Sequence, residues 1–428
     1  MRAALWLLAL FAVAVAAALF AGNNQSTLTL FWPPHRVDLS LNLVLLVLVA
    51  VFVVVHLALR ALAALFEMPA QARRWRNQQK ERATHTALLD ALGHLLAGRF
   101  IRARKAALAA LSRERALDGS GERLAHAVQL RAMAHLVAAE SAQALQDRAS
   151  RDEHLQQALD QTLGRHGVAT QELREGIQLR AARWALDERD VQASLGWLEA
   201  LPVGVQRRTV ALRIRLKASR MARQTAVALE TARLLAKHRA FSPVAAQSLL
   251  RGLIADLIHG AHDLAQLQRV WSGLDPSERM MPDIAVQAAR RVLEVSGDGT
   301  LACSWLLPVW ESVHEKLAAL NDIQRVRLVR TLEDAMAVAD ENGERDWLAR
   351  IELAQQRHPR DASLQYLAGK ACMNRRLWGK AQQLLTQAVA GMPDSELRVR
   401  AWRALAELAE QRGDVDGAAL AWKSAAQG

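Results

Sequence analysis

Cysteine and tyrosine are nearly absent from this chain of 428 residues, which has two cysteines and a single tyrosine. Cys303 and Cys372 share no CxxC-type spacing, so neither a zinc site nor a disulfide framework is indicated. A single buried pair remains open, although reduced structural thiols are expected in a cytosolic domain. Aromatic residues make up only 5%, and there are 22 glycines and 10 prolines. Because helix formers dominate instead, the composition predicts an all-α fold.

Catalytic motifs are missing as well. The sequence contains no GxGxxG after a strand, no GxxxxGK[ST], no HExxH and no GxSxG. The segment SGDGT at Ser296–Thr300 follows a predicted helix, so we interpret it as a turn between helices. We therefore identify no catalytic residue and expect a protein that is not an enzyme.

Two long uncharged runs stand near the N-terminus. Ala3–Ala21 has 19 residues and Leu39–Leu59 has 21, and each is long enough to cross about 30 Å of hydrocarbon as a helix. We predict transmembrane helices at about residues 3–21 and 39–62, forming a membrane anchor over residues 1–66. A cleavable signal peptide is the alternative for the first run. Between the runs, the alternation of Thr27–Phe31 and the Pro33-Pro34 pair predict a small hairpin at the outer interface.

The net charge of +12 is concentrated after the second run. Residues 73–115 hold 11 Lys/Arg against 3 Asp/Glu, whereas Arg36 is the one basic residue of the link between the runs, apart from its histidine. The positive-inside rule therefore predicts that both termini are cytoplasmic. The sequence offers membrane lipid, rather than nucleic acid, as the partner of a membrane-proximal basic cluster, made of Arg73, Arg74, Arg76, Lys80 and Arg82.

The remaining residues, 67–428, form one predicted helical domain with a repeated spacing. A tetratricopeptide unit is a helical hairpin of about 34 residues with small side chains where its helices cross and large ones that fill the groove. Two units at the C-terminus and one turn near residue 98 fit this pattern. The predicted packing positions are Gly98, Phe100, Ala103, Gly369, Ala381, Leu385, Ala388, Trp402, Ala418, Trp422 and Ala425. Stacked hairpins form an α-solenoid whose concave surface binds other proteins.

Three histidines are candidates for a haem or porphyrin site. His56 lies within the second run, and an ionisable residue at membrane depth is a functional candidate. His259 and His262 are three residues apart and could share a helix face. We favour solvated or capping histidines near the helix end at Gly260 as the interpretation of this pair. His126 and His135, nine residues apart, are too distant for one metal, and we predict no metal site.

The order of these segments resembles the proteobacterial HemY-type inner-membrane proteins. The resemblance is carried by Gly22, by the run Val37–Leu41 that opens the second span, and by the Gly98-Arg99-Phe100 turn with Ala103. It implies an inner-membrane protein with tetratricopeptide-like repeats, associated with a late step of protohaem synthesis. The name is shared with an unrelated flavin-dependent protoporphyrinogen oxidase, whose dinucleotide-binding start this chain lacks.

Together, the residues and the resemblance predict a membrane-anchored scaffold or regulator that binds enzymes of the haem pathway. Two alternatives remain open: a tetrapyrrole carrier, and a general cell-envelope assembly adaptor with no haem role.

Overall fold

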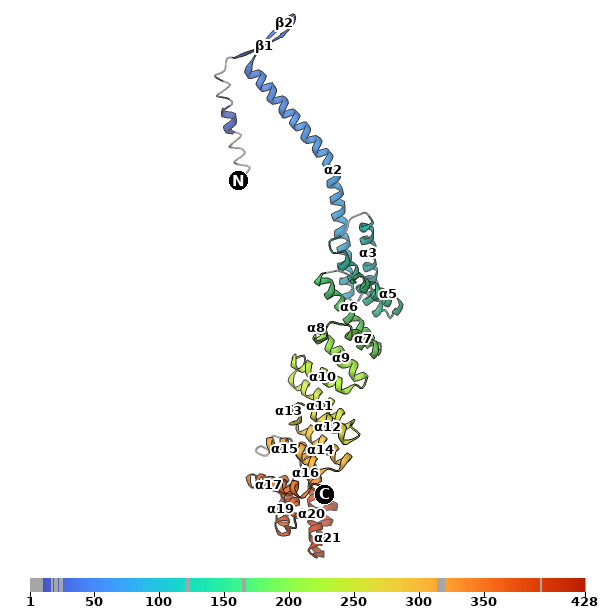
Figure 1. Cartoon of the computed structure of the whole chain (residues 1–428), viewed down its shortest axis with the longest axis vertical. Helices are drawn as coiled ribbons and strands as arrows, with labels where there is room; N and C mark the ends of the chain where they lie inside the picture. The colour runs from blue at the N-terminus through green and yellow to red at the C-terminus, as the bar shows by residue number, and fades with distance from the viewer. Residues whose placement is uncertain are drawn as a thin grey trace. The chain divides into compact units, whose positions relative to one another are not determined.

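The computed structural model describes residues 11–16, 18, 22, 26–119, 124–163, 167–313, 320–392 and 395–427, and for residues 63–74 and 395 it describes only the backbone. The chain divides into two compact units, Met1–Arg174 and Glu175–Gly428. Apart from one short hairpin of strands, the described elements are helices joined mostly by short turns (Figure 1). The prediction of an all-α fold of stacked helical hairpins is confirmed.

The predicted hairpin is present at the start of the described chain. Strands β1 (Thr27–Trp32) and β2 (His35–Ser40) pair antiparallel, with Thr27 opposite Ser40 and Trp32 opposite His35. Phe31 and Trp32, next to the turn, are 74% and 73% exposed. The guanidinium of Arg36 lies 5.4 Å from the centre of the Phe31 ring. The hairpin therefore presents an aromatic tip, while its position at a membrane interface stays a prediction.

Helix α2 (Leu41–Leu96) begins directly after the hairpin. The Ser40 hydroxyl accepts a hydrogen bond from the Leu43 N–H at 3.3 Å, which caps the first turn. Its first part, Leu41–Leu62, is long and apolar enough to cross a membrane. Among the described residues it is the one such helix. Most of the first predicted span, residues 3–21, lies outside the described residues, although residues 11–16 and 18 are helical.

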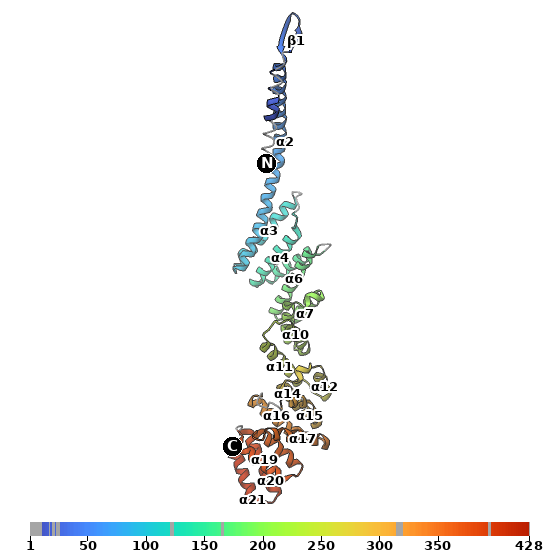
Figure 2. The same cartoon turned by 90° about the vertical axis from the view of Figure 1, so that its left-hand side faces the viewer.

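The same helix continues without a break into the repeats (Figure 2). At about 1.5 Å per residue, its 56 residues extend about 84 Å. The boundary predicted at residue 66 therefore lies inside one helix. Near its C-terminal end, Ala87 packs with Leu111 and Leu130, and Ala91 packs with Ala103. Since alanine side chains are short, the helix axes approach closely there.

The first unit continues with α3 (Phe100–Asp118), α4 (Ala127–Ala144) and α5 (Arg148–Gln161), and α6 (Val168–Asp187) crosses the boundary into the second unit. The helices of the second unit are α7 (Val191–Glu199), α8 (Val203–Gln206), α9 (Thr209–Met221), α10 (Thr225–Lys237), α11 (Pro243–His259), α12 (Leu264–Ser272), α13 (Pro276–Arg279), α14 (Pro282–Ser296), α15 (Gly299–Val313), α16 (Asp322–Met336), α17 (Glu341–Arg357), α18 (Ala362–Asn374), α19 (Trp378–Gly391), α20 (Ser395–Gln411) and α21 (Val415–Gln427).

One backbone pattern recurs at the turns between helices. A residue with positive φ follows the first helix, and the next residue donates its N–H to the carbonyl five residues earlier. This turn occurs at Gly98, Gln146, Arg189, Arg223, Arg239, Arg376 and Gly413. Such a left-handed residue satisfies the last carbonyls of a helix and is usually glycine. Because five of these seven positions are Arg or Gln, glycine spacing alone could not reveal the repeat.

Side-chain caps mark where many helices begin. Polar side chains just before several described helices accept a hydrogen bond from a backbone N–H of the first turn, as Ser40 does, and they include Asp147, Asp190, Ser242, Asp263, Asn321, Asp340 and Asp361. Each satisfies a donor that the helix itself leaves unpaired. These local signals set where the helices begin.

Alternate helices of the second unit form a continuous row. Helix α11 contacts α14, α14 contacts α16, α16 contacts α18 and α18 contacts α20, while α15, α17, α19 and α21 pack behind their partners. Tryptophans fill part of the interior: the rings of Trp271 and Trp305 stack with centres 4.6 Å apart, and Trp310 meets Trp347 edge-on at 5.7 Å. The row provides a surface built from successive hairpins.

The two C-terminal hairpins place the predicted packing positions differently. A Cβ at Gly369 would lie 2.8 Å from Leu385 Cγ, and Ala381, Leu385 and Ala388 are fully buried. In the last hairpin Ala418 and Ala425 are buried and Trp402 is half-buried. Trp422 is 40% exposed, and its indole N–H donates to Glu410 at 2.7 Å. The indole of Trp422 therefore covers the end of a hairpin rather than filling a closed groove.

Candidate functional site

The membrane-proximal part of α2 carries the first two groups of predicted site residues. His56 is exposed and stacks on Phe52, with ring centres 6.2 Å apart. Arg76, Lys80 and Arg82 are exposed beyond the apolar stretch, beside Trp75 at 61% exposure. The side chains of Arg73 and Arg74 lie outside the described atoms. The haem role of His56 and the lipid contact of the basic cluster both stay predictions.

His259 and His262 do not lie on one helix face. Helix α11 ends at His259, and His262 belongs to the turn before Asp263, which caps α12. The backbone N–H of His262 donates to Gln266 Oε1 at 3.1 Å. The side chain of His259 is exposed and lines a cavity. The two histidines therefore share no helix face, the possibility that the sequence left open, because the helix ends between them.

A histidine pair that sequence reasoning missed lies in the first unit. His135 of α4 and His154 of α5 place their Nδ1 atoms 3.3 Å apart, and His154 Nδ1 lies 3.3 Å from Gln157 Oε1. Burial, with smaller contributions from His154, Arg115 and Arg131, lowers the pKa of His135 to about 4. The pair is therefore neutral at His135 near pH 7. The described residues contain no group of three or more potential metal ligands.

The two cysteines are separate buried thiols, as predicted. Burial, followed by the charge of Asp340, raises the pKa of the Cys303 thiol to about 12. Burial also raises the pKa of Cys372. Because the thiolate is the reactive form, both side chains are poor nucleophiles.

Two cavities with basic linings lie in the second unit. The first, about 320 Å³, opens between α11, α14 and α16, and its lining residues include His259, Pro282, Asp283, Val286, Gln287, Arg290, Arg291, Glu294, Gln324 and Arg327. The second, about 440 Å³, is lined by Arg213, Leu216, Lys217, Arg220, Met221 and Phe241. Both cavities are rich in basic side chains. The first cavity has no local sign in the sequence, since it assembles residues from three helices, whereas every lining residue of the second cavity except Phe241 lies on α9.

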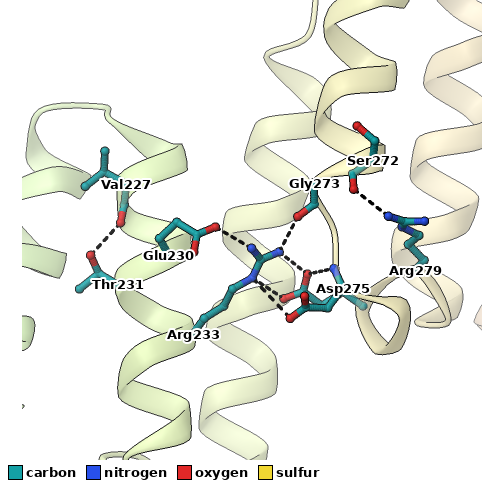
Figure 3. A network of polar contacts seen from close by, with 9 residues as sticks. Val227, Glu230, Thr231, Arg233, Ser272, Gly273, Asp275 and Arg279 are labelled. Carbon is teal, nitrogen blue, oxygen red and sulfur yellow. Dashed lines mark hydrogen bonds and ion pairs between the residues drawn. The ribbon is translucent and has the colours of Figure 1, made fainter. Parts of the chain in front are cut away.

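A partly buried arginine, Arg233, links separate helices of the second unit. Arg233 of α10 donates to Glu278 of α13 through Nη2 and Nε at 2.5 and 3.0 Å. It also donates to the Gly273 carbonyl at 3.1 Å and to Glu230 at 2.6 Å (Figure 3). Glu278 in turn accepts from the Asp275 N–H at 2.9 Å. The guanidinium therefore joins α10 to the α12–α13 turn.

Comparison with known families concerns the N-terminal part. Residues 26–146 match the family model described as HemY protein N-terminus. The likeness to this family covers these N-terminal residues. This HemY region takes in the hairpin, α2, α3 and α4 and ends at the turn after α4. No curated protein matches the chain significantly.

Three solved structures are loosely similar. One is Naa15/Naa10 bound to HypK-THB, with a TM-score of 0.26 and 12% identity over 79% of this chain and 58% of that one. Another is the APC/C hetero-tetramer Cut9–Hcn1, with a TM-score of 0.29 and 14% identity over 80% of this chain and 66% of that one. A third is the P58(IPK) TPR domain, with a TM-score of 0.21 and 13% identity over 76% of this chain and 98% of that one. The chain thus spans less than two thirds of the first two, and the fold rests on its own helices.

Proposed function

We propose that this chain is a membrane-anchored helical-repeat scaffold, without turnover of its own, that holds enzymes of a late step of protohaem synthesis. The observation that carries the proposal is the continuity of α2, which passes from the apolar stretch Leu41–Leu62 into the packed residues near Ala87. An anchor and an interaction domain joined by one helix suit a protein that gathers partners beside a bilayer. The HemY N-terminal region supports the connection with haem.

The proposal includes a division of the chain and a topology. Residues 1–66 form the anchor, with two spans, and residues 67–428 form the repeat domain on the cytoplasmic side of the inner membrane. The exposed Arg76, Lys80 and Arg82 contact anionic lipid, each with about 1 kcal/mol of attraction. Reporter fusions at residue 34 and at the C-terminus test this topology: the first should be active outside and the second inside. Two fusions active on the same side would contradict it.

The scaffold role is tested by deletion and capture together. A deletion strain should accumulate porphyrin intermediates, and the full chain should restore their normal levels. The tagged chain, solubilised in mild detergent, should enrich protoporphyrinogen oxidase or ferrochelatase in quantitative mass spectrometry. A matched variant replaces Leu41–Leu62 by an unrelated apolar helix of equal length, and it should complement fully if this span only anchors.

Three results would end the proposal. Unchanged porphyrins in the deletion strain, with no tetrapyrrole enzyme enriched, would favour a general envelope adaptor. A Soret band in the purified chain after haem titration, lost on substituting His56 or His259, would favour a tetrapyrrole carrier instead. Turnover of a porphyrin by the pure chain would make it an enzyme.

A further inference from the structure

The cavity between α11, α14 and α16 contains two acidic groups, and both are already neutralised. Asp283 accepts a hydrogen bond from Arg251 at 3.1 Å and from Gln324 Nε2 at 3.0 Å. Glu294 accepts from Arg291 at 3.0 Å. Arg291 is further held by the Ala261 carbonyl, with its Nη2 and Nε at 2.9 and 3.1 Å. These contacts leave no acidic group in the lining free for the other basic side chains.

Three cationic or donor groups in the same lining are unpartnered. Arg290 of α14, Arg327 of α16 and His259 of α11 are exposed, and their side chains make no hydrogen bond or ion pair with any described residue. By contrast, Arg233, Arg330 and Arg400 of the same unit each pair with an acidic side chain. The two free guanidiniums come from helices that contact each other. Together they give the cavity a positively charged rim that can bind an anionic group.

The rest of the lining indicates what kind of anion fits. Ile258 and Val286 are 1% and 5% exposed and, with Pro282, give the cavity an apolar floor. Gln287 and Gln324 use their Nε2 groups on Ala255 O and Asp283, so their side-chain carbonyls can accept from a peptide N–H. A peptide offers carboxylates, apolar side chains and backbone N–H groups together. A lipid phosphate needs neither the floor nor the acceptors.

We propose that this cavity binds an acidic, extended peptide segment of a partner protein, with its carboxylates on Arg290 and Arg327 and an apolar side chain on Val286. Guanidinium–carboxylate pairs are short, directional and often bidentate, so two of them fix the register of a bound segment. The inference deepens the proposed scaffold role, on which it rests for taking the occupant to be a protein. The inference specifies the chemical class of the partner segment that the scaffold would bind.

The test uses the full chain in detergent and two fluorescent probe peptides, one of alternating Glu and Leu and one with Gln in place of every Glu. We expect the acidic peptide to bind and the Gln peptide not to bind, by fluorescence anisotropy. The double variant Arg290→Gln/Arg327→Gln should weaken the acidic peptide at least tenfold. The matched control Lys217→Gln/Arg220→Gln removes the same charge from the second cavity and should change the affinity less than twofold.

Reversing the charge of both arginines tests the inference by a gain of binding rather than by a loss. Arg290→Glu/Arg327→Glu should bind a peptide of alternating Lys and Leu that the unaltered chain ignores. Far-UV circular dichroism should match for all variants, since the substituted side chains are exposed.

Several outcomes would overturn the inference. The first is equal weakening by the control pair, which means that net charge alone attracts the peptide. The second is full affinity in Arg290→Gln/Arg327→Gln. The third is preferential binding of vesicles containing anionic lipid, displaced by neither peptide, and the fourth is a haem complex that the double variant loses. Self-association reduced by the double variant would assign the cavity to a second copy.

The peptide-binding test and the test of the proposed function can give opposite results, so a failure of one can be told apart from a failure of the other. If the peptide binds as expected while a deletion strain keeps normal porphyrins, the haem role fails and the peptide site stands. If porphyrins accumulate and captured enzymes are found, but neither peptide binds, the scaffold role stands and the site lies elsewhere.

Discussion

Arg233 and Arg290 are both arginines on helices of the second unit, yet their surroundings are opposite. The guanidinium of Arg233 has Glu230 and the Gly273 carbonyl as partners (Figure 3). It also pairs with Glu278, which is 3% exposed. Arg290 is exposed and pairs with no described residue. One arginine is part of the fold, whereas the other is available to a ligand. The partners of a charged side chain, rather than its type, separate the two roles.

The largest expected effect comes from breaking the partnered arginine. Arg233→Met should destabilise the α10–α13 region by about 3 kcal/mol, because the Glu278 carboxylate is left buried without its countercharge. Hydrogen exchange of peptides from this region should accelerate, since repeat arrays open locally. Arg290→Met should change the local stability by less than about 0.5 kcal/mol.

A double variant sharpens this prediction. Arg233→Met/Glu278→Leu removes both charges, and it should recover most of the lost protection because an apolar pair can replace a buried ion pair. Equal acceleration in Arg233→Met and Arg290→Met would erase the distinction between the two arginines.

The same comparison between a partnered and an unpartnered side chain applies to two histidines, and it predicts how stability depends on pH. His135 is 4% exposed and contacts His154, whereas His259 is exposed and unpartnered among the described residues. With its pKa lowered to about 4, His135 stays neutral in the fold while the unfolded chain takes up a proton near pH 6.5. Stability should therefore fall as the pH drops from about 6.5 to about 4, by on the order of 3 kcal/mol, and stay constant above pH 7.

Hydrogen exchange of α4 and α5 peptides across this pH range, corrected for intrinsic rates, measures the effect. His135→Leu should flatten the dependence, and His259→Gln should leave it unchanged. A wild-type slope no steeper than that of His135→Leu would show that the pair does not resist protonation.

Local features of this fold were predictable, and contacts between distant segments were not. The hairpin at Thr27–Ser40 and the apolar stretch Leu41–Leu62 were visible because alternation and hydropathy are local signals. The Gly369–Leu385 crossing followed from spacing within one hairpin. The pair of His135 and His154, however, depends on how α4 meets α5, and periodicity along one helix instead drew attention to His126.

The candidate site shows the same limit. Arg290 and Arg327 belong to helices that contact each other, 37 positions apart, but nothing in either segment marks its arginine as unpartnered. That property depends on where Asp283 and Glu294 find their partners, Arg251 and Arg291. The sequence therefore predicted that the array binds proteins, but not which of its many charges are free to do so.

A substitution at a packing position should change stability by a smaller amount, and it involves no charge. Gly369→Ala should lower the stability of the α18–α19 hairpin by about 1–2 kcal/mol, because overpacking against Leu385 outweighs the helix propensity gained. The added Cβ would meet Leu385 Cγ at 2.8 Å and Cδ2 at 2.9 Å. Gly252→Ala is the control: it has no atom within 4 Å and should stabilise α11 by up to about 1 kcal/mol. Thermal unfolding of both variants checks the signs, and stabilisation by both would mean that the crossing is loose.

The smallest expected effect on stability comes from Arg251, whose pairing with Asp283 neutralises an acidic group of the first cavity. Arg251 is about half exposed and pairs with Asp283 at the edge of the first cavity. Exposed pairs contribute little, so Arg251→Gln should cost less than about 0.5 kcal/mol. It should nevertheless weaken the acidic probe peptide several-fold, because Asp283 loses its countercharge and repels the carboxylates that Arg290 and Arg327 attract. Asp283→Asn in the same background removes that repulsion and should restore the affinity. Unchanged affinity in Arg251→Gln would mean that Asp283 does not influence the peptide, and the charge balance of the lining would then not explain why this cavity is basic.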